Sequence, residues 1–155
     1  MNVDFLREAI RFSIEKMEQG AGGPFGAVVV KDGQIVGRGW NGVTSHNDPT
    51  AHAEIMAIRD ACKNLQTYQL SGCAIYSSCE PCPMCLSAIY WARIPNLYFA
   101  ASSQDADAAG FSDEYILHEM KRDWIERELH VEQDLQDEAR VAFDLWSKQE
   151  SRKRY

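Results

Sequence analysis

Apolar side chains recur at intervals of three and four positions near both ends of the chain. The first series runs from Phe5 to Met17 and predicts an amphipathic helix over roughly residues 2–19. The second series marks one face of a C-terminal helix and consists of Leu135, Ala139, Ala142, Phe143 and Trp146. Both ends of the chain are therefore expected to be helical.

Short apolar runs bounded by turn residues indicate β-strands between these two helices. The dipeptide Asp32-Gly33 favours a tight turn, so a β-hairpin is expected around it. Two further apolar runs and a short segment near residue 130 complete the set. The five expected strands cover residues 25–30, 35–40, 74–78, 97–101 and 129–131.

Helical patterns alternate with these strands. One helix is predicted from about Ala51 to Asn64, with Thr50 as its candidate capping residue. Another begins at Pro83, which the first turn of a helix accommodates, and continues to about Arg93; a short one covers residues 116–120. The alternation predicts an α/β protein, a three-layer α/β/α sandwich with a central mixed five-stranded sheet. Since repeats and linkers are absent from the sequence, residues 1–155 are expected to form a single domain.

Charge and composition narrow the classes of partner. Sixteen Lys and Arg face twenty-three Asp and Glu, for a formal net charge of -7. Such a balance gives none of the general attraction to phosphate backbones that nucleic-acid binders use, and the basic cluster Arg152-Lys153-Arg154 is more typical of a solvated helix end. The sequence has neither an apolar run of about 18 residues nor a basic start followed by an apolar stretch. We therefore expect no nucleic-acid or membrane partner and a cytoplasmic location.

The spacing of the cysteines suggests a metal site. Five cysteines, an odd number without an export signal, argue against a disulfide framework. Cys82 and Cys85 lie three positions apart at a predicted helix start, so their sulfurs can share one face, and the helix amides favour the zinc-binding thiolate form. His52 opens another predicted helix. If the two helix starts face one another across a sheet edge, His52, Cys82 and Cys85 can bind one Zn²⁺ per subunit.

Three protein ligands leave one position of a tetrahedral zinc for water, which the metal can activate near neutral pH. Glu54 lies two residues beyond His52 and is suited to accept the proton of that water and pass it to a substrate. A closed structural zinc site with Cys79 as fourth ligand is the alternative, and it would leave Glu54 without a role. Cys62 and Cys73 are expected to be buried apolar residues.

Several motifs carry a resemblance to a known family. His-x-Glu together with Pro-Cys-x-x-Cys is the signature of zinc deaminases, and here it resembles the cytidine deaminase superfamily. Nearly the whole chain is similar to the bacterial guanine deaminases within that superfamily, except for a stretch from about Lys121 to Glu138 that matches no motif. The segments that carry this similarity are 22–28, 47–54, 79–85, 88–93 and 109–113, with a chain that ends in Tyr155.

The resemblance implies further site residues. It places Asn41 where an amide binds the purine and Asp113 where a carboxylate holds the amino group or helps it leave; without the resemblance, Asn41 would be interpreted as a turn residue and Asp113 as a loop cap. It also implies base contacts from four more residues, although core packing would explain the first two equally well: Phe25, Trp91, Ala53 and Tyr155. The resemblance further implies that the C-terminal tail closes the base site, either of its own subunit or of a neighbouring one. It also implies a homodimer, in which the segment of about 134–155 is a candidate for exchange between subunits.

The implied reaction is the hydrolytic deamination of guanine, a small purine base, to xanthine and ammonia in purine catabolism or salvage. Hydroxide at the zinc would attack the amino-bearing carbon, with Glu54 as proton shuttle. A tRNA adenosine deaminase is the main alternative, because it shares the zinc motifs and a similar length, although the net charge of -7 disfavours it. The motifs are also compatible with deamination of another small base or nucleoside, and with a non-catalytic zinc-stabilised binding module.

Overall fold

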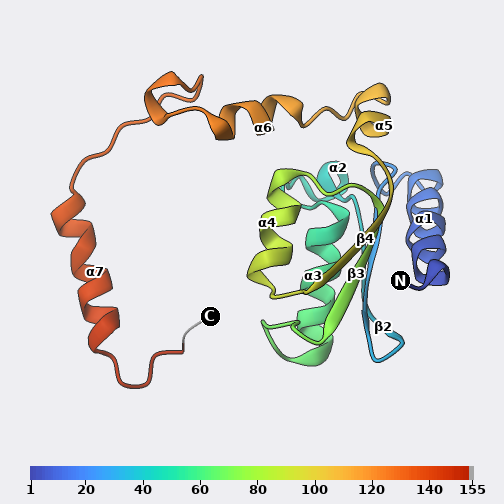
Figure 1. Cartoon of the computed structure of the whole chain (residues 1–155), viewed down its shortest axis with the longest axis horizontal. Helices are drawn as coiled ribbons and strands as arrows, with labels where there is room; N and C mark the ends of the chain where they lie inside the picture. Colours follow the sequence, from blue (N-terminus) through green and yellow to red (C-terminus); the bar gives the residue numbers. More distant parts are fainter. Residues whose placement is uncertain (154–155) are drawn as a thin grey trace. The chain divides into compact units, whose positions relative to one another are not determined.

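Five consecutive residues of strand β1 (Gly26–Lys31) are buried, as expected for a strand whose two faces are both covered. The computed structural model describes residues 1–153. They divide into two compact units, 1–114 and 115–153. We call them the N-terminal unit and the C-terminal unit. Figure 1 labels their helices and strands along the chain.

The N-terminal unit contains one mixed sheet of four strands in the order β2-β1-β3-β4. Strand β1 pairs antiparallel with both β2 and β3, whereas β3 and β4 are parallel. Helix α1 covers one face of this sheet, and α3 and α4 cover the other (Figure 1). The predicted three layers and mixed sheet are thus confirmed. The elements other than β1 are α1 (Val3–Glu18), β2 (Gln34–Trp40), α2 (Val43–His46), α3 (Ala53–Leu65), β3 (Cys73–Cys79), α4 (Pro83–Trp91), β4 (Asn96–Ala101) and α5 (Ser103–Ala108).

The prediction of five strands is wrong, because the sheet of the described residues has four. Residues 129–131, the expected fifth strand, have no regular secondary structure. They belong to the C-terminal unit, whose described elements are the helices α6 (Glu114–Lys121), η1 (Trp124–Glu126) and α7 (Gln136–Lys148). A strand requires a second strand for its backbone hydrogen bonds, and the described part of this unit offers none.

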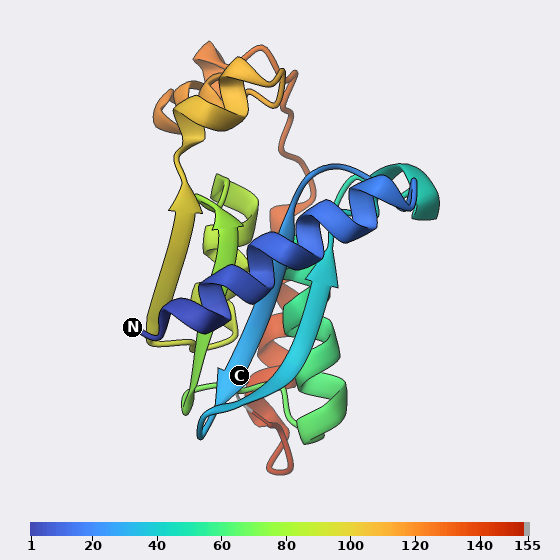
Figure 2. The same ribbon diagram turned by 90° about the vertical axis from the view of Figure 1, so that its right-hand side faces the viewer.

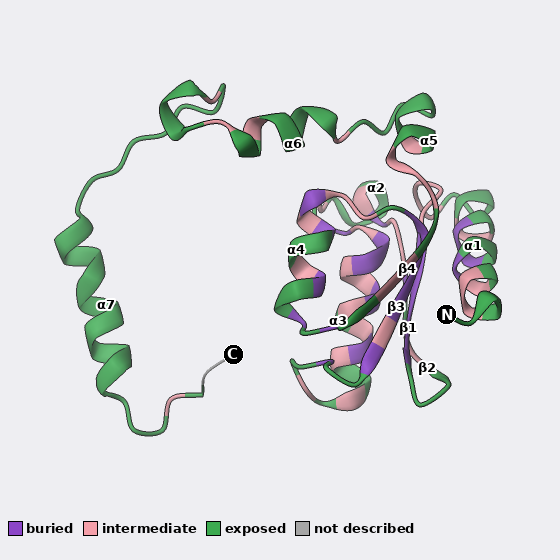
Figure 3. Ribbon diagram, viewed as in Figure 1, coloured by how far each residue is buried: buried purple, intermediate pink, exposed green. Residues whose placement is uncertain are grey.

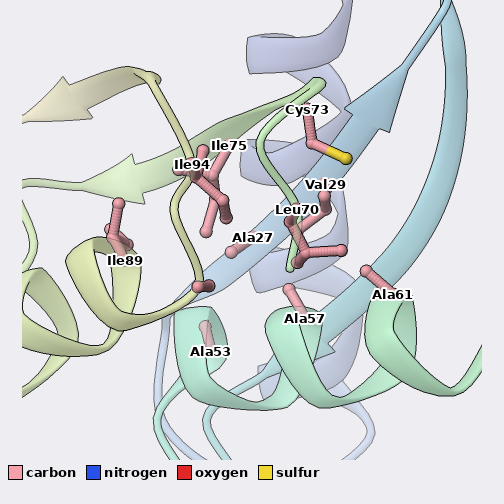
Figure 4. Packing of buried hydrophobic residues seen from close by; sticks show 11 residues of the cluster. Ala27, Val29, Ala53, Ala57, Ala61, Leu70, Cys73, Ile75, Ile89 and Ile94 are labelled. Carbon is pink, nitrogen blue, oxygen red and sulfur yellow. The ribbon is translucent and has the colours of Figure 1, made fainter. Parts of the chain in front are cut away.

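The main core cluster lies between the sheet and the helices α3 and α4. Alternating residues of β1 point to opposite faces, so Ala27 and Val29 join this cluster while Val28 and Val30 pack towards α1. Figure 4 shows Ala53, Ala57 and Ala61 along the face of α3 that contacts the sheet side chains. Cys73 is buried, as predicted. The same prediction is wrong for Cys62, which is only half-buried and packs against this cluster from outside.

Two glycines let α3 lie directly on β2. A Cβ atom on Gly39 would stand 2.1 Å from the carbonyl oxygen of Ala53, and one on Gly37 would stand 2.4 Å from that of Ala57. Any side chain at either position would therefore push the helix away from the strand. Since His52 directly precedes α3, this close approach also sets the position of the imidazole at the edge of the sheet.

The start of α3 differs from the prediction. The N-cap residue is His52, without a side-chain capping bond. Thr50 instead donates its hydroxyl to Asp48 Oδ1 at 2.6 Å, so it stabilises the preceding turn. Tertiary packing of α3 against β2 decided this boundary, and local capping propensity did not. Among the helices of residues 1–153, none has the length and apolar character needed to cross a membrane.

Candidate metal and active site

The candidate site lies at one edge of the sheet, because of the strand directions. Strands β2, β3 and β4 run in the same direction and end at this edge, where the antiparallel β1 begins (Figure 2). Chain segments far apart in sequence therefore meet there. They are Phe25 before β1, Asn41 after β2, the motif Cys79–Cys85 at the end of β3, and Ser102 after β4.

Three side chains at the starts of two helices form a group that can hold a metal ion. His52 is the N-cap of α3, Cys82 is the N-cap of α4, and Cys85 lies in the first turn of α4 behind Pro83. Their ligand atoms all lie within 4.8 Å of one another. We call His52, Cys82 and Cys85 the donor triad, and the expected approach of two helix starts is confirmed.

The spacing within the donor triad matches a tetrahedral zinc. His52 Nδ1 lies 3.5 Å from Cys82 Sγ and 3.5 Å from Cys85 Sγ. A tetrahedral ion with Zn–N of about 2.05 Å and Zn–S of about 2.3 Å separates nitrogen from sulfur by about 3.6 Å. One imidazole and two thiols are also the ligand types that zinc prefers. The residues therefore fit zinc in both distance and chemistry.

The two thiols of the donor triad differ in acidity. Hydrogen bonds from the side chain and backbone of Cys85, together with the hydrogen bond and the charge of His52, lower the pKa of Cys82 to about 4, although burial opposes the shift. The same bond to Cys82, together with burial, raises the pKa of Cys85. The hydrogen bond to Cys82 raises the pKa of His52. A metal that binds both sulfurs as thiolates would therefore release the proton that the two cysteines share.

Cys79, the alternative fourth ligand, does not belong to the group. Its thiol donates to the carbonyl oxygen of Ser102 at 3.4 Å, and its side chain is buried at the end of β3. The donor triad therefore consists of three residues, as an open catalytic zinc site requires.

Glu54 is buried beside the donor triad, with only 6% of its surface exposed. Its Oε1 accepts a hydrogen bond of 2.8 Å from the hydroxyl of Ser77, a buried residue of β3. Burial raises the pKa of Glu54, against hydrogen bonds from its own backbone, Ser77 and Cys85 that favour the carboxylate. A buried carboxyl group with a raised pKa beside a group of metal ligands is suited to proton transfer.

Ser77 was not predicted as a site residue. Its signal in the sequence was the polar pair Ser77-Ser78 inside an otherwise apolar strand. Ser77 points towards Glu54, whereas Ser78 accepts a hydrogen bond of 3.0 Å from the backbone N–H of Gly26. Because a buried hydroxyl requires a partner, a serine in such a strand indicates a polar group on the facing element.

Backbone hydrogen bonds connect Asn41 and its neighbour Gly42 to the segments before β1 and before His52. Its own N–H donates to Phe25 O at 3.1 Å, and the N–H of Gly42 donates to Ala51 O at 2.8 Å, one residue before His52. The side-chain Oδ1 accepts from Val43 N at 3.3 Å, so Asn41 also has the turn role that its position before Gly42 suggests. The Nδ2 group makes no hydrogen bond to another described residue and can donate to a ligand.

Asp113 lies in the loop after α5 and is partly buried. Its pKa is raised mainly by burial and next by the negative charges of Cys82, Glu80 and Asp107. Because the charge of Cys82 acts on Asp113, this carboxyl group lies close enough to the donor triad to interact with it electrostatically.

The remaining predicted base contacts are placed differently. Ala53 is fully buried in the core, so only its backbone could meet a ligand. Phe25 packs partly on the main core cluster and partly on Phe111. Trp91 is 66% exposed at the end of α4, six residues beyond Cys85 and hence about 9 Å further along the helix axis. Tyr155 lies outside the described residues.

Comparison with known proteins agrees with this geometry. Residues 2–101 match the family described as the cytidine and deoxycytidylate deaminase zinc-binding region. The chain is 49% identical to a guanine deaminase of Bacillus subtilis over 97% of both chains. A crystal structure of guanine deaminase from that organism covers 100% of this chain and 99% of its own, with a TM-score of 0.97.

A second group of relatives covers only part of the chain. A tRNA-specific adenosine deaminase of Aquifex aeolicus is 43% identical over 97 residues, which are 63% of this chain and 64% of the relative. Both this relative and the Bacillus protein are named as deaminases. The family match covers the starts of α3 and α4, which carry the donor triad. The chain therefore belongs to the cytidine and deoxycytidylate deaminase family.

Proposed function

We propose that this protein is a zinc-dependent guanine deaminase that converts guanine and water into xanthine and ammonia. The observation that carries the proposal is the buried carboxyl of Glu54, oriented by Ser77 beside the donor triad. The choice of guanine is supported by the near-complete coverage of a guanine deaminase, since that similarity includes the residues beyond the zinc-binding region.

His52, Cys82 and Cys85 would hold the zinc ion, one in each subunit. Bound zinc would supply a Lewis acid that lowers the pKa of water to about 7. Glu54 would accept the proton of the attacking water and deliver it to the ring nitrogen next to the amino-bearing carbon. A second proton passed by Glu54 would let the exocyclic nitrogen leave as ammonia while the carbonyl of xanthine forms. Ser77 keeps one oxygen of Glu54 in place throughout.

The substrate contacts are proposed from the positions of the side chains around this centre. Asn41 would donate a hydrogen bond from Nδ2 to a ring acceptor, and Asp113 would accept one from the exocyclic amine. Phe25 would contact the flat ring, and Ala53 would act through its backbone N–H at the start of α3. Trp91 and Tyr155 are proposed to contact the base in the assembled enzyme.

A tRNA adenosine deaminase is the weaker candidate. Relatives of that kind match between 63% and 76% of the chain, whereas the guanine deaminase match covers 97% of it. The acidic balance of the chain, -7, also gives no general attraction to the phosphates of an anticodon loop.

We further propose a cytoplasmic homodimer in which the segment of about 134–155 is exchanged between subunits, within a single functional deaminase domain. The support is the apolar surface of α7, where Phe143 is 73% and Leu145 is 59% exposed. Side chains of this size usually acquire a covering surface. Light scattering would give about twice the mass of 17.6 kDa for the proposed assembly.

The function is tested with zinc-loaded protein and guanine, with xanthine formation followed by absorbance. Conversion that is lost in the Glu54→Gln variant, at unchanged zinc content, is the expected result. An adenosine-containing tRNA anticodon stem-loop, assayed in parallel for inosine, is the competing substrate. Conversion of the stem-loop without conversion of guanine would replace the proposed substrate.

A further inference from the structure

Phe111 has no role in the chemistry described so far, yet the structure fixes its backbone at the end of α5. The N–H of Phe111 donates to Ala106 O at 2.9 Å, and the N–H of Gly110 donates to Asp107 O at 2.8 Å. This pair of bonds is a Schellman motif, and Gly110 adopts the positive φ of 89° that the motif requires. The direction in which Phe111 leaves the helix is therefore determined by α5.

Helix α5 is in turn bound to the segment that carries Cys82. Ser102 and Asp105 form a reciprocal capping box at its start. Glu80, two residues before Cys82, accepts a hydrogen bond from Ser103 N at 3.0 Å and donates its own N–H to Ala101 O at 2.8 Å. Phe111 is thus connected to the donor triad through a short, doubly capped helix.

The ring of Phe111 lies against residues already assigned to the substrate. It contacts Phe25 edge to face, with ring centroids 5.0 Å apart and an interplanar angle of 89°. A Cβ atom on Gly23 would lie 3.5 Å from Asn41 Cγ and 3.7 Å from Phe111 Cε1, so Gly23 borders both side chains. Phe111 nevertheless remains 45% exposed. An aromatic ring that is held in place, half exposed and next to an amide is suited to contact another flat ring.

We propose that Phe111 is a substrate-positioning residue, which forms with Phe25 an aromatic corner beside Asn41 and contacts the flat purine. The inference rests on the proposed function. The perpendicular rings offer the base one aromatic surface and one edge, while the amide of Asn41 sets the in-plane direction. Gly23 keeps the space next to the amide free of a side chain.

The test compares Phe111→Ala and Phe111→Tyr with wild-type enzyme. Loss of one aromatic contact with a base weakens binding about tenfold. We expect Phe111→Ala to raise KM for guanine about tenfold, with kcat within about twofold, and Phe111→Tyr to restore KM. Tyr68→Ala is the matched control, because Tyr68 is an aromatic residue of similar exposure, 50%, in the loop after the far end of α3.

Binding to 8-azaguanine, measured by calorimetry in zinc-loaded Glu54→Gln protein, separates this inference from the proposed function. If wild-type protein makes no xanthine, the function fails, and a dissociation constant that Phe111→Ala raises about tenfold still supports the role of Phe111. An unchanged KM and dissociation constant would overturn it. So would equal losses in Phe111→Ala and Phe111→Tyr accompanied by lower zinc content, because these indicate a purely structural role. Failure of the Glu54→Gln protein to bind 8-azaguanine would overturn the role of Phe111, whereas the proposed function is decided by xanthine formation in wild-type protein.

Discussion

The two units of the chain differ in how far their apolar side chains are buried. In the N-terminal unit, Leu70 and Ile75 are almost completely buried. In the C-terminal unit, none of the described residues 115–153 is buried, and Ile125 is 96% exposed. Figure 3 shows the buried residues confined to the N-terminal unit, in its sheet, the helices packed on the sheet and the loops between them. The chemistry that needs low water access, above all that of Glu54, is found only in the N-terminal unit.

Local interactions stabilise the C-terminal unit instead. Glu119 accepts a hydrogen bond from Glu128 N at 2.7 Å and pairs with Arg122 at 2.7 Å. The guanidinium of Arg127 lies 3.8 Å from the ring centroid of Trp124. Such contacts are sufficient to shape a helix and a turn. A buried catalytic carboxyl requires a packed core around it, which in this protein is the sheet with helices on both faces.

The largest contrast is expected from one substitution made in both units. Glu54→Gln should lower kcat about a thousandfold, because glutamine keeps the shape and can still accept from Ser77 but transfers no proton. Glu138→Gln, in the first turn of the exposed α7, should leave kcat within about twofold. Steady-state kinetics at measured zinc content provide the comparison. A Glu54→Gln enzyme with a tenth of the wild-type rate or more would contradict the proton-transfer role.

The two units should also differ in how a large-to-small substitution changes the free energy of unfolding. Ile75→Ala should lower the free energy of unfolding by about 3 kcal/mol at every protein concentration, because it opens a cavity in the main core cluster. Phe143→Ala should cost about 1 kcal/mol, and only at concentrations where the chains associate, because 73% of Phe143 is exposed within one chain. Urea titrations at two protein concentrations measure both effects. An effect of Phe143→Ala that is independent of concentration would exclude a covering partner chain.

Ser77→Ala should act on catalysis more than on stability. Without the hydroxyl, one oxygen of Glu54 loses its bond of 2.8 Å, and kcat should fall about tenfold with little change in KM. Ser78→Ala is the control in the adjacent position, since its hydroxyl bonds the backbone of Gly26 on the other side of β3. Equal kinetic effects of the two substitutions would indicate a general weakening of the strand.

The smallest expected effect is the loss of a local hydrogen bond in the C-terminal unit at low pH. The hydrogen bond from Glu128 N and the pairing with Arg122 lower the pKa of Glu119 below its ordinary 4.5. A depressed folded-state pKa gives stability that is present above the unfolded value and lost as the pH falls through the folded value. The turn between α6 and η1 should therefore loosen only below about pH 4.5. Amide exchange of Glu128 measures this, and the Glu119→Gln variant should show no such step.

Much of the N-terminal unit could be predicted from local pattern. The hairpin around Asp32-Gly33 and the helix from Pro83 depend on turn and capping chemistry within a few residues. The donor triad was also accessible, because Cys82 and Cys85 lie within one helical turn and His52 opens another helix. By contrast, Thr50 as helix cap and residues 129–131 as a strand were wrong, since both depend on what packs or pairs with the segment.

By itself, the sequence determined the longer helices and the four strands of the N-terminal unit, the ligand types and the presence of a carboxyl near the metal ligands, because spacing along a helix or strand is a local property. Only the tertiary structure decided that Ser77 holds Glu54 and that Phe111 reaches Phe25 beside Asn41. Those contacts join segments separated by more than twenty residues. They exist because the strand directions bring four chain segments to one edge of the sheet.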